Sequence, residues 1–159
     1  MNKRVLDVCC GSKCFYFDKH SPDVLFCDCR REKRKIQSNR TIAVDPDEIQ
    51  DFRNLPKEWG GIFNLVVFDP PHLLRAGETG WLFAKYGRLN DTWKEDLRQG
   101  FAECWRCLRN GGTLIFKWNE EQIPISEVLK LAPAKPLLGN RSGKKTHWIV
   151  FYKGLGNEF

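Results

Sequence analysis

The chain has 159 residues, 42% of them hydrophobic, and a formal net charge of +6. This length fits one domain with one core, and the hydrophobic content is too high for a disordered chain. No apolar run approaches the roughly 18 residues that a membrane helix needs. The apolar run near the start is short and contains Asp7, which argues against a signal peptide and for a cytoplasmic protein. The positive charge favours an anionic partner.

The seven cysteines are expected to be free thiols, because their number is odd and no export signal precedes them. Two pairs raise the possibility of a zinc site. Cys27 and Cys29 are spaced too tightly for a usual zinc knuckle, and Cys104 and Cys107 lie in a helical pattern with no second pair nearby. We therefore predict small buried side chains and no metal.

The first third of the chain predicts two buried strands, at residues 4–10 and 23–29, with a short helix at 14–20 between them. A basic segment follows at 30–40. Residues 41–51 indicate one or two short strands, and they stay ambiguous because Pro46 interrupts them.

The middle of the chain gives the clearest signals. Residues 62–69 form an apolar strand, and a loop at 73–91, punctuated by glycines, is long enough to act as a lid. The segment 92–110 predicts a helix, because Thr92 and Glu95 form a capping box and apolar residues recur at spacings of three to four. Gly111 should end that helix.

The remaining segments complete an α/β fold. A strand is predicted at 112–118, a short helix at 125–132, and a terminal hairpin from 134–139 and 146–153. Strands that alternate with helices, followed by a hairpin, predict a mostly parallel sheet with helices on both faces. We expect one domain over residues 1–153 and a frayed tail over 154–159.

The informative residues fall at the predicted carboxyl ends of the strands, where open α/β sheets bind ligands. Gly11 follows the first strand, and Asp28, Asp51 and Asp69 close the next three segments. The glycine turn lacks the pattern of a dinucleotide fingerprint and is not a Walker loop. The acids would repel phosphates, so they suit a ligand with hydroxyls, amines and a positive centre.

Four segments carry a resemblance to a known family: "VLDVCCGS" (5–12), "LFCDC" (25–29), "DFRNLP" (51–56) and "VVFDPPHLL" (66–74). With them the chain resembles the class I S-adenosylmethionine (SAM) dependent methyltransferases, over nearly its whole length. Within that class it is similar to the amino-methyltransferases with an Asp/Asn-Pro-Pro-aromatic motif, and to small methyltransferases of phages and mobile elements. The resemblance implies a single-domain Rossmann-like methyltransferase fold.

The resemblance also implies a SAM site. The loop from Asp7 to Ser12 would lie under the methionine part, Asp28 would hold the ribose hydroxyls, and Asp51 would accept from the adenine amine. One position departs from the family, because Lys13 stands where a second glycine is expected. The side chain of Lys13 would either narrow the turn or reach the carboxylate of SAM. The implied cofactor-binding residues are Asp7, Cys9, Cys10, Gly11, Ser12, Asp28, Asp51, Phe52 and Asp69.

The proline corner suggests a chemistry, since an exocyclic amine is a poor nucleophile with a delocalised lone pair. The Asp69 carboxylate and the Pro70 carbonyl would accept the two N–H groups, and Pro71 would fix the direction of that carbonyl. His72 takes the aromatic position, where its ring would stack on an unpaired base. Each acid could instead brace a turn, and His72 could be a surface residue without a role.

Basic segments suggest a nucleic-acid partner, RNA or DNA, in single-stranded or loop form. The predicted substrate-binding cations are Arg30, Arg31, Arg34, Lys35, Arg75, Arg141 and Lys144, with Trp81, Phe83 and Tyr86 interleaved in the lid. A solvated charged loop and a lid packed on the sheet are the alternatives. No separate target-recognition domain fits, so recognition would need a homodimer or a protein partner.

We therefore expect N-methylation of a base amino group, with adenine N6 favoured. A methyltransferase for a small molecule or a protein glutamine is a second reading. A SAM-binding or nucleic-acid-binding module without turnover is a third.

Overall fold

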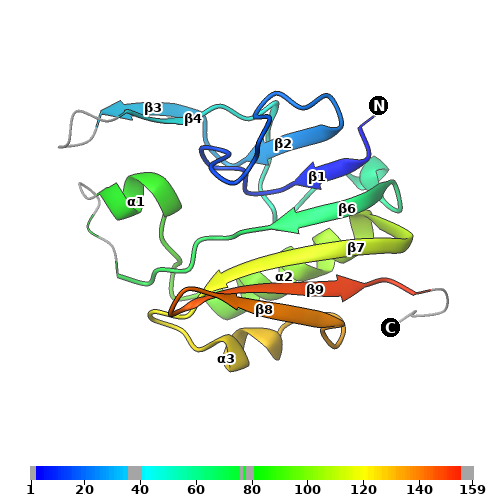
Figure 1. Ribbon diagram of the computed structural model, residues 1–159. Helices are drawn as coiled ribbons and strands as arrows, with labels where there is room; N and C mark the ends of the chain where they lie inside the picture. Colours follow the sequence, from blue (N-terminus) through cyan, green and yellow to red (C-terminus); the bar gives the residue numbers. More distant parts are fainter. Residues whose placement is uncertain (1–2, 36–40, 76, 78–80, 155–159) are drawn as a thin grey trace.

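The computed structural model describes residues 3–35, 41–75, 77 and 81–154. It contains a seven-stranded sheet in the order β5-β2-β1-β6-β7-β9-β8 and a separate two-stranded sheet, β3-β4 (Figure 1). The strands are β1 (Val5–Asp7), β2 (Val24–Asp28), β3 (Glu32–Lys35), β4 (Thr41–Val44), β5 (Glu48–Ile49), β6 (Phe63–Phe68), β7 (Leu108–Asn119), β8 (Leu138–Ser142) and β9 (Thr146–Tyr152). The helices are α1 (Trp81–Tyr86), α2 (Trp93–Cys107) and α3 (Ile125–Leu129), with a 3₁₀ turn at Lys57–Trp59.

The sheet confirms the predicted mostly parallel order with an antiparallel terminal hairpin. β5, β2, β1, β6 and β7 pair in parallel, and β9 and β8 add an antiparallel hairpin at one edge. The predicted strands correspond to β1, β2, β6 and β7, and the carboxyl ends of these parallel strands meet at one edge. None of the helices in the described ranges is long and apolar enough to span a membrane.

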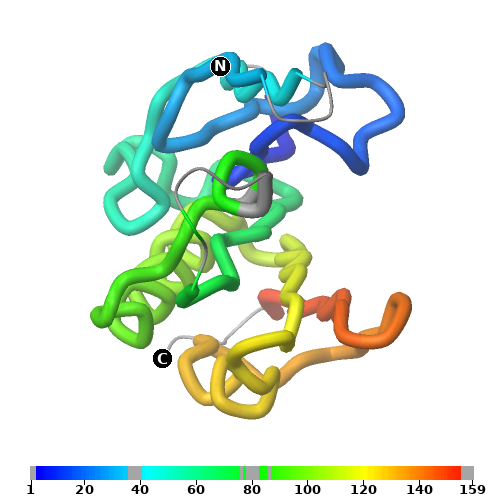
Figure 2. Tube along the Cα trace, turned by 90° about the vertical axis from the view of Figure 1, so that its left-hand side faces the viewer, coloured from blue at the N-terminus to red at the C-terminus, as the bar shows by residue number. Residues whose placement is uncertain are grey.

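The helix α2 covers one face of the sheet (Figures 1 and 2). Leu97, Phe101 and Cys104 turn inward and join the main hydrophobic cluster with alternate residues of β6 and β7. Val128 of α3 joins the same cluster, so α2 and α3 share a face. Burial of this apolar stripe, rather than helix propensity alone, holds α2 in place.

Two details of the helix predicted at 92–110, which corresponds to α2, are wrong. The helix ends at Cys107 instead of Asn110, because Leu108 already pairs with Phe63 at the start of β7. The capping box does not form either. The Thr92 hydroxyl donates to Asp96 Oδ2 at 2.9 Å, and Glu95 binds Arg98 at 2.6 Å, so neither side chain caps a backbone N–H.

The predicted helix at 14–20 is also wrong, since this segment forms turns on the opposite face of the sheet. Asp18 Oδ1 accepts the His20 N–H at 2.8 Å, and this local turn competes with helix formation. Tyr16 packs edge-on against Phe26, and Phe15 packs edge-on against Trp148. Aromatic rings in a loop therefore cover part of this face of the sheet, where the alternation of strands and helices along the chain predicts a helix.

Two further segments gain structure that the sequence did not predict. Residues 32–35 of the basic segment form β3, which pairs with β4 as an antiparallel ribbon. The segment 73–91, called the lid segment below, contains α1. Both lie beyond the carboxyl edge of the sheet (Figure 1). Residues 36–40 of the basic segment and residues 155–159, which are most of the predicted tail, lie outside the described residues.

Gly100 allows α2 to approach the sheet closely. A Cβ at this position would lie 2.6 Å from Phe52 and 2.7 Å from Phe68. We predict that Gly100→Ala lowers the free energy of unfolding by about 1–2 kcal/mol, because overpacking outweighs the roughly 1 kcal/mol gain in helix propensity. Urea unfolding measures this, with the exposed neighbour Gln99→Ala as the control. A stabilised Gly100→Ala variant would contradict the packing.

Candidate functional site

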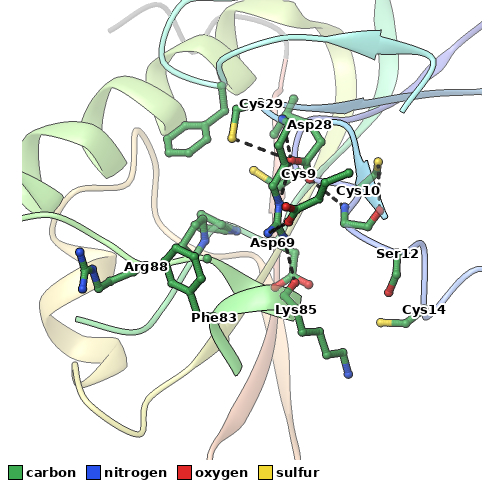
Figure 3. Close-up of a pocket in the computed structure, with 18 of the residues that line it drawn as sticks. Cys9, Cys10, Ser12, Cys14, Asp28, Cys29, Asp69, Phe83, Lys85 and Arg88 are labelled. Carbon is green, nitrogen blue, oxygen red and sulfur yellow. Dashed lines mark hydrogen bonds and ion pairs between the residues drawn. The ribbon is translucent and has the colours of Figure 1, made fainter. Parts of the chain in front are cut away.

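A pocket of about 260 Å³ opens at the carboxyl edge of the sheet. It is lined by the turn after β1, the end of β2 with the start of β3, Phe52 after β5, the corner after β6, and the lid segment. Figure 3 shows Asp28, Cys9 and Asp69 near its centre, with Phe83 and Arg88 of the lid segment on one side and Ser12 and Cys14 on the other. Parallel pairing in register brings these distant segments together.

Asp7 is completely buried at the floor of this edge. Its Oδ1 accepts the Cys9 N–H at 3.1 Å, while Oδ2 has no hydrogen bond of normal geometry among the described residues. The Tyr16 hydroxyl approaches the same carboxyl group. Burial, with a smaller contribution from the negative charges of Asp69 and Asp28, raises the pKa of Asp7 from 3.8 to about 7. Asp7 can therefore change protonation near neutral pH.

Asp28 links the glycine turn to the lid segment. Its Oδ2 accepts the Gly11 N–H at 3.0 Å, and its Oδ1 accepts the Arg30 N–H at 3.2 Å. The Arg30 guanidinium lies 3.6 Å from Oδ1 and donates to the carbonyl oxygens of Ala84 and Lys85. Arg30 thereby holds the last turn of α1 over the pocket, where helical carbonyls lack partners.

Lys13 takes the conformation expected of a glycine. Its φ is 54°, in the left-handed region. Its ammonium lies 4.2 Å from the centre of the Phe26 ring, on the far side of the turn, and Lys13 does not line the pocket. In this conformation Lys13 does not reach the pocket, while a narrowed turn and a contact with the carboxylate of SAM stay predictions.

Asp69 is nearly buried, with its side chain 12% exposed, beside a lysine that the sequence analysis missed. Lys117 of β7 donates to Asp69 Oδ2 at 2.7 Å. Burial raises the pKa of Asp69, while the charges of Lys117 and Lys85 oppose that rise. The register could have revealed the pair, because Phe68 lies opposite Phe116 and each is followed by one of the two charged residues. A lysine within an apolar strand is the signal.

The proline corner forms part of the pocket wall, and both Pro70 and Pro71 line it. Gly87 of the lid segment lies against Pro71, because a Cβ there would be 3.5 Å from the Pro71 ring. His72 lies behind this corner. It is only 7% exposed and packs edge-on to Trp118, so it does not line the pocket. Burial lowers the pKa of His72 to about 4, so its ring is neutral at physiological pH.

The two residues predicted to contact the adenine of SAM, Asp51 and Phe52, differ in their relation to the pocket. Phe52 lines the pocket, as predicted, but Asp51 does not. Both carboxylate oxygens of Asp51 accept hydrogen bonds from Arg53, and this pairing lowers the pKa of Asp51. Arg53 would therefore compete with a ligand for the carboxylate of Asp51.

The predicted substrate cations are dispersed rather than gathered. Arg30 is tied to the lid segment, as above. Arg31 binds Asp45 at 3.2 Å and the Pro46 carbonyl, so it fixes the base of the ribbon. Arg34 is half-buried in β3, whereas Lys35 is exposed.

The other predicted cations lie away from the pocket lining. Arg141 binds Glu120 and the Lys144 carbonyl within the β8–β9 hairpin, where Lys144 is exposed. Arg75 is exposed and fixed through its backbone to Gln122. The lid segment instead contributes Lys85 and Arg88 to the pocket.

The cysteines behave as free thiols in the described structure. Cys9, Cys10, Cys14 and Cys29 line the pocket, and burial raises the pKa of Cys9, Cys10 and Cys29. No cluster of His, Cys, Asp or Glu among the described residues could hold a metal ion. Phe83 lines the pocket, while the side chains of Trp81 and Tyr86 lie outside what the structure describes.

Comparisons with known proteins give the fold. No protein-family model matches, and no curated protein matches. The PH0226 protein of Pyrococcus horikoshii is similar over 98% of this chain and 84% of its own, with 17% identity and a TM-score of 0.61. The antibiotic-resistance methyltransferase Kmr is similar over 96% and 86%, with 14% identity and a TM-score of 0.51. This chain has the Rossmann-like methyltransferase fold.

A third similar structure is the 16S rRNA N2 G1207 methyltransferase of Thermus thermophilus, RsmC, in complex with AdoMet and guanosine. It matches over 98% of this chain with 16% identity and a TM-score of 0.53. This chain spans 36% of that enzyme.

The buried Asp7 generates a prediction about stability and pH. Between about pH 4 and pH 7 the unfolded chain releases the Asp7 proton while the folded protein keeps it, so rising pH destabilises the fold. We predict that Asp7→Asn removes this contribution and gains on the order of 2–4 kcal/mol relative to the parent at pH 8. Denaturant unfolding at pH 4, 6 and 8 measures it. A difference between the two proteins that does not change with pH would contradict an acid titrating in this range.

Proposed function

We propose that this protein is a SAM-dependent N-methyltransferase that acts on an exocyclic amino group of a nucleic-acid base, with adenine N6 favoured. One observation carries the proposal. The corner Asp69-Pro70-Pro71 lines the same pocket as the turn around Gly11 and the strand-end Asp28. The fold shared with known methyltransferases supports it.

The pocket residues fit SAM. Asp28 Oδ2 accepts one hydrogen bond, from the Gly11 N–H, and a carboxylate oxygen has about two acceptor sites, so Oδ2 retains capacity for a ribose hydroxyl. The carboxylate of Asp69 would favour a cationic group nearby, whereas Asp7 lies outside the pocket lining and keeps its proton up to about pH 7. Phe52 offers an apolar ring in the pocket wall. When bound, SAM supplies a methyl group already activated by its sulfonium.

The residues of the corner would prepare the accepting nitrogen. Asp69 Oδ2 accepts from Lys117, which leaves Oδ1 to accept one amine N–H. The Pro70 carbonyl would take the second N–H, with its direction restricted by Pro71. Two fixed acceptors localise the nitrogen lone pair and stabilise the positive charge that develops on nitrogen. Positioning rather than prior deprotonation is the main contribution of the protein.

The Lys117–Asp69 pair favours a neutral amine. A protonated alkylamine would have to compete with Lys117 for Asp69 and would meet the charge of Lys85 as well. The amino group of a base is neutral at pH 7. A glutamine amide shares this property, so a protein or small-molecule amide remains an alternative substrate.

The same ion pair favours a second candidate, a SAM-binding or nucleic-acid-binding module without turnover. Lys117 already occupies one oxygen of the carboxylate that the chemistry requires. Methyl incorporation from labelled SAM into separate pools of RNA, DNA and protein separates the two functions. Mass spectrometry of the digested nucleosides then identifies the product.

Asp69 should be needed for transfer and not for cofactor binding. We predict that Asp69→Ala binds SAM within about threefold of the parent but loses at least about a hundredfold in methyl transfer, because an acceptor for the amine is gone. Calorimetry with SAM and the labelling assay measure the two quantities. The exposed Asp91→Ala is the control. An Asp69→Ala variant with full activity would exclude the mechanism.

Lys117 should set the acidic limb of the pH profile. Its charge lowers the pKa of Asp69, so Lys117→Met raises that pKa further. A higher pKa leaves less ionised Asp69 at a given pH. We predict that the variant loses more activity at pH 6 than at pH 9, measured as kcat/KM relative to the parent. Equal losses at both pH values would show that Lys117 does not act through Asp69.

A further inference from the structure

The β3–β4 ribbon carries a charge that the rest of the fold does not neutralise. Lys33 and Lys35 pair directly with Ala43 and Thr41, so these four side chains share one face of the ribbon. All four are exposed. The opposite face contains Glu32, Arg34, Ile42 and Val44, which are half-buried or buried. The ribbon therefore has an inner face toward the protein and an outer face toward solvent.

Some basic residues in and around the β3–β4 ribbon form ion pairs, and others do not. Each of three acids has a basic partner: Glu32 pairs with Arg30, Asp45 with Arg31, and Asp47 with Lys3. Arg30 and Arg31 of the basic segment are thus used within the fold. Neither Lys33 nor Lys35 has an ion-pair partner in the described part of the chain.

The ribbon is also placed next to the pocket. Its first residue, Glu32, lines the pocket, together with Arg30 and Cys29 just before it. The ribbon extends beyond the carboxyl edge of the sheet, on the same side as α1 (Figure 1). A polyanion bound on its outer face would lie beside the pocket mouth.

We propose that this outer face, with Lys33 and Lys35, binds the phosphates of a single-stranded nucleic acid next to the target nucleotide. Two lysines that are two residues apart in a strand are separated by about 6.6 Å. Each lysine places its ammonium group on a flexible four-carbon stem, so the two ammonium groups can reach separate phosphates of one strand. The small, uncharged outer residues Thr41 and Ala43 leave room for the nucleic-acid backbone to approach.

This inference rests on the proposed function for the nature of the ligand, but it makes a separate claim about where the ligand binds. It also revises the predicted substrate surface. Arg30 and Arg31 hold the lid segment and the ribbon base, and the contacts to phosphate pass to Lys33 and Lys35. Removing Arg30 would disturb the pocket itself, so it cannot serve as a test of nucleic-acid binding.

The test is fluorescence anisotropy of the full chain with a labelled RNA of about 12 nucleotides, across a range of salt concentrations. Lys33→Gln with Lys35→Gln is the test variant. Lys57→Gln with Arg109→Gln is the control, because both residues are exposed cations at the opposite, amino edge of the sheet. We expect the test variant to bind at least about tenfold more weakly near 0.1 M salt, with a salt slope lower by about 1.4. The control should match the parent.

Further measurements keep the claim separate from protein folding and from turnover. SAM affinity by calorimetry and the unfolding transition should be the same in all three proteins. An unlabelled DNA of the same sequence, added as competitor, shows whether the surface distinguishes RNA from DNA. RNA affinity that is unchanged in the test variant, or that falls equally in the control, would overturn the proposal.

The two proposals can fail independently. RNA binding through the two lysines without methylation of any nucleic acid would retain the ribbon surface and reject the proposed function. Methylation of a nucleic acid with the same KM in parent and test variant would retain the function and reject the ribbon surface.

Discussion

The structure at the carboxyl edge of the sheet depends on how the negative charges of three buried or nearly buried carboxyl groups are neutralised. These groups belong to Asp7, Asp28 and Asp69. Asp28 and Asp69 have cationic partners, Arg30 and Lys117, that come from other parts of the edge. Asp7 has none among the described residues and responds through a raised pKa. An unpaired charge in a core is costly, so a group either finds a partner or tends to stay neutral. The pocket combines both solutions within a few residues.

The cationic partners connect the pocket to segments that the sheet alone would leave separate. Arg30 joins the end of β2 to α1 and to the start of the ribbon. Lys117 joins the corner after β6 to β7, and its ammonium also lies 5.5 Å from the Phe15 ring and 5.7 Å from the Trp148 ring. The position of the lid segment is therefore coupled to the acid that closes β2.

Much of the sheet could be predicted from the sequence, because buried parallel strands are continuous apolar runs, as residues 62–69 show. The carboxyl-edge location of Asp28 and Asp69 followed from that topology. The turns at 14–20 could not be predicted in the same way, since an Asp18 hydrogen bond and aromatic packing on Phe26 and Trp148 decide them. The end of α2 was missed because pairing with β6 overrides a helical pattern.

The roles of the charged residues were harder to predict, because they depend on contacts across the chain. Arg30 and Arg31 appear in one basic run with Lys35, yet the two arginines form ion pairs within the fold, whereas Lys35 has no ion-pair partner among the described residues. Within β3 the alternation of the strand leaves Lys33 and Lys35 exposed and Arg34 half-buried, and the sequence did not indicate a strand there. The expected role of Asp51 at the adenine amine did not take account of Arg53, which lies two residues later and donates to its carboxylate.

The claim on which the account depends is that the pocket around Gly11, Asp28 and Asp69 binds SAM. Isothermal titration of SAM into the parent protein and into Asp28→Ala tests it most directly. The account predicts measurable binding by the parent and a loss of at least about tenfold in the variant, since a carboxylate that accepts ribose hydroxyls is removed. Absence of heat with the parent, or equal affinity in the two proteins, would contradict it.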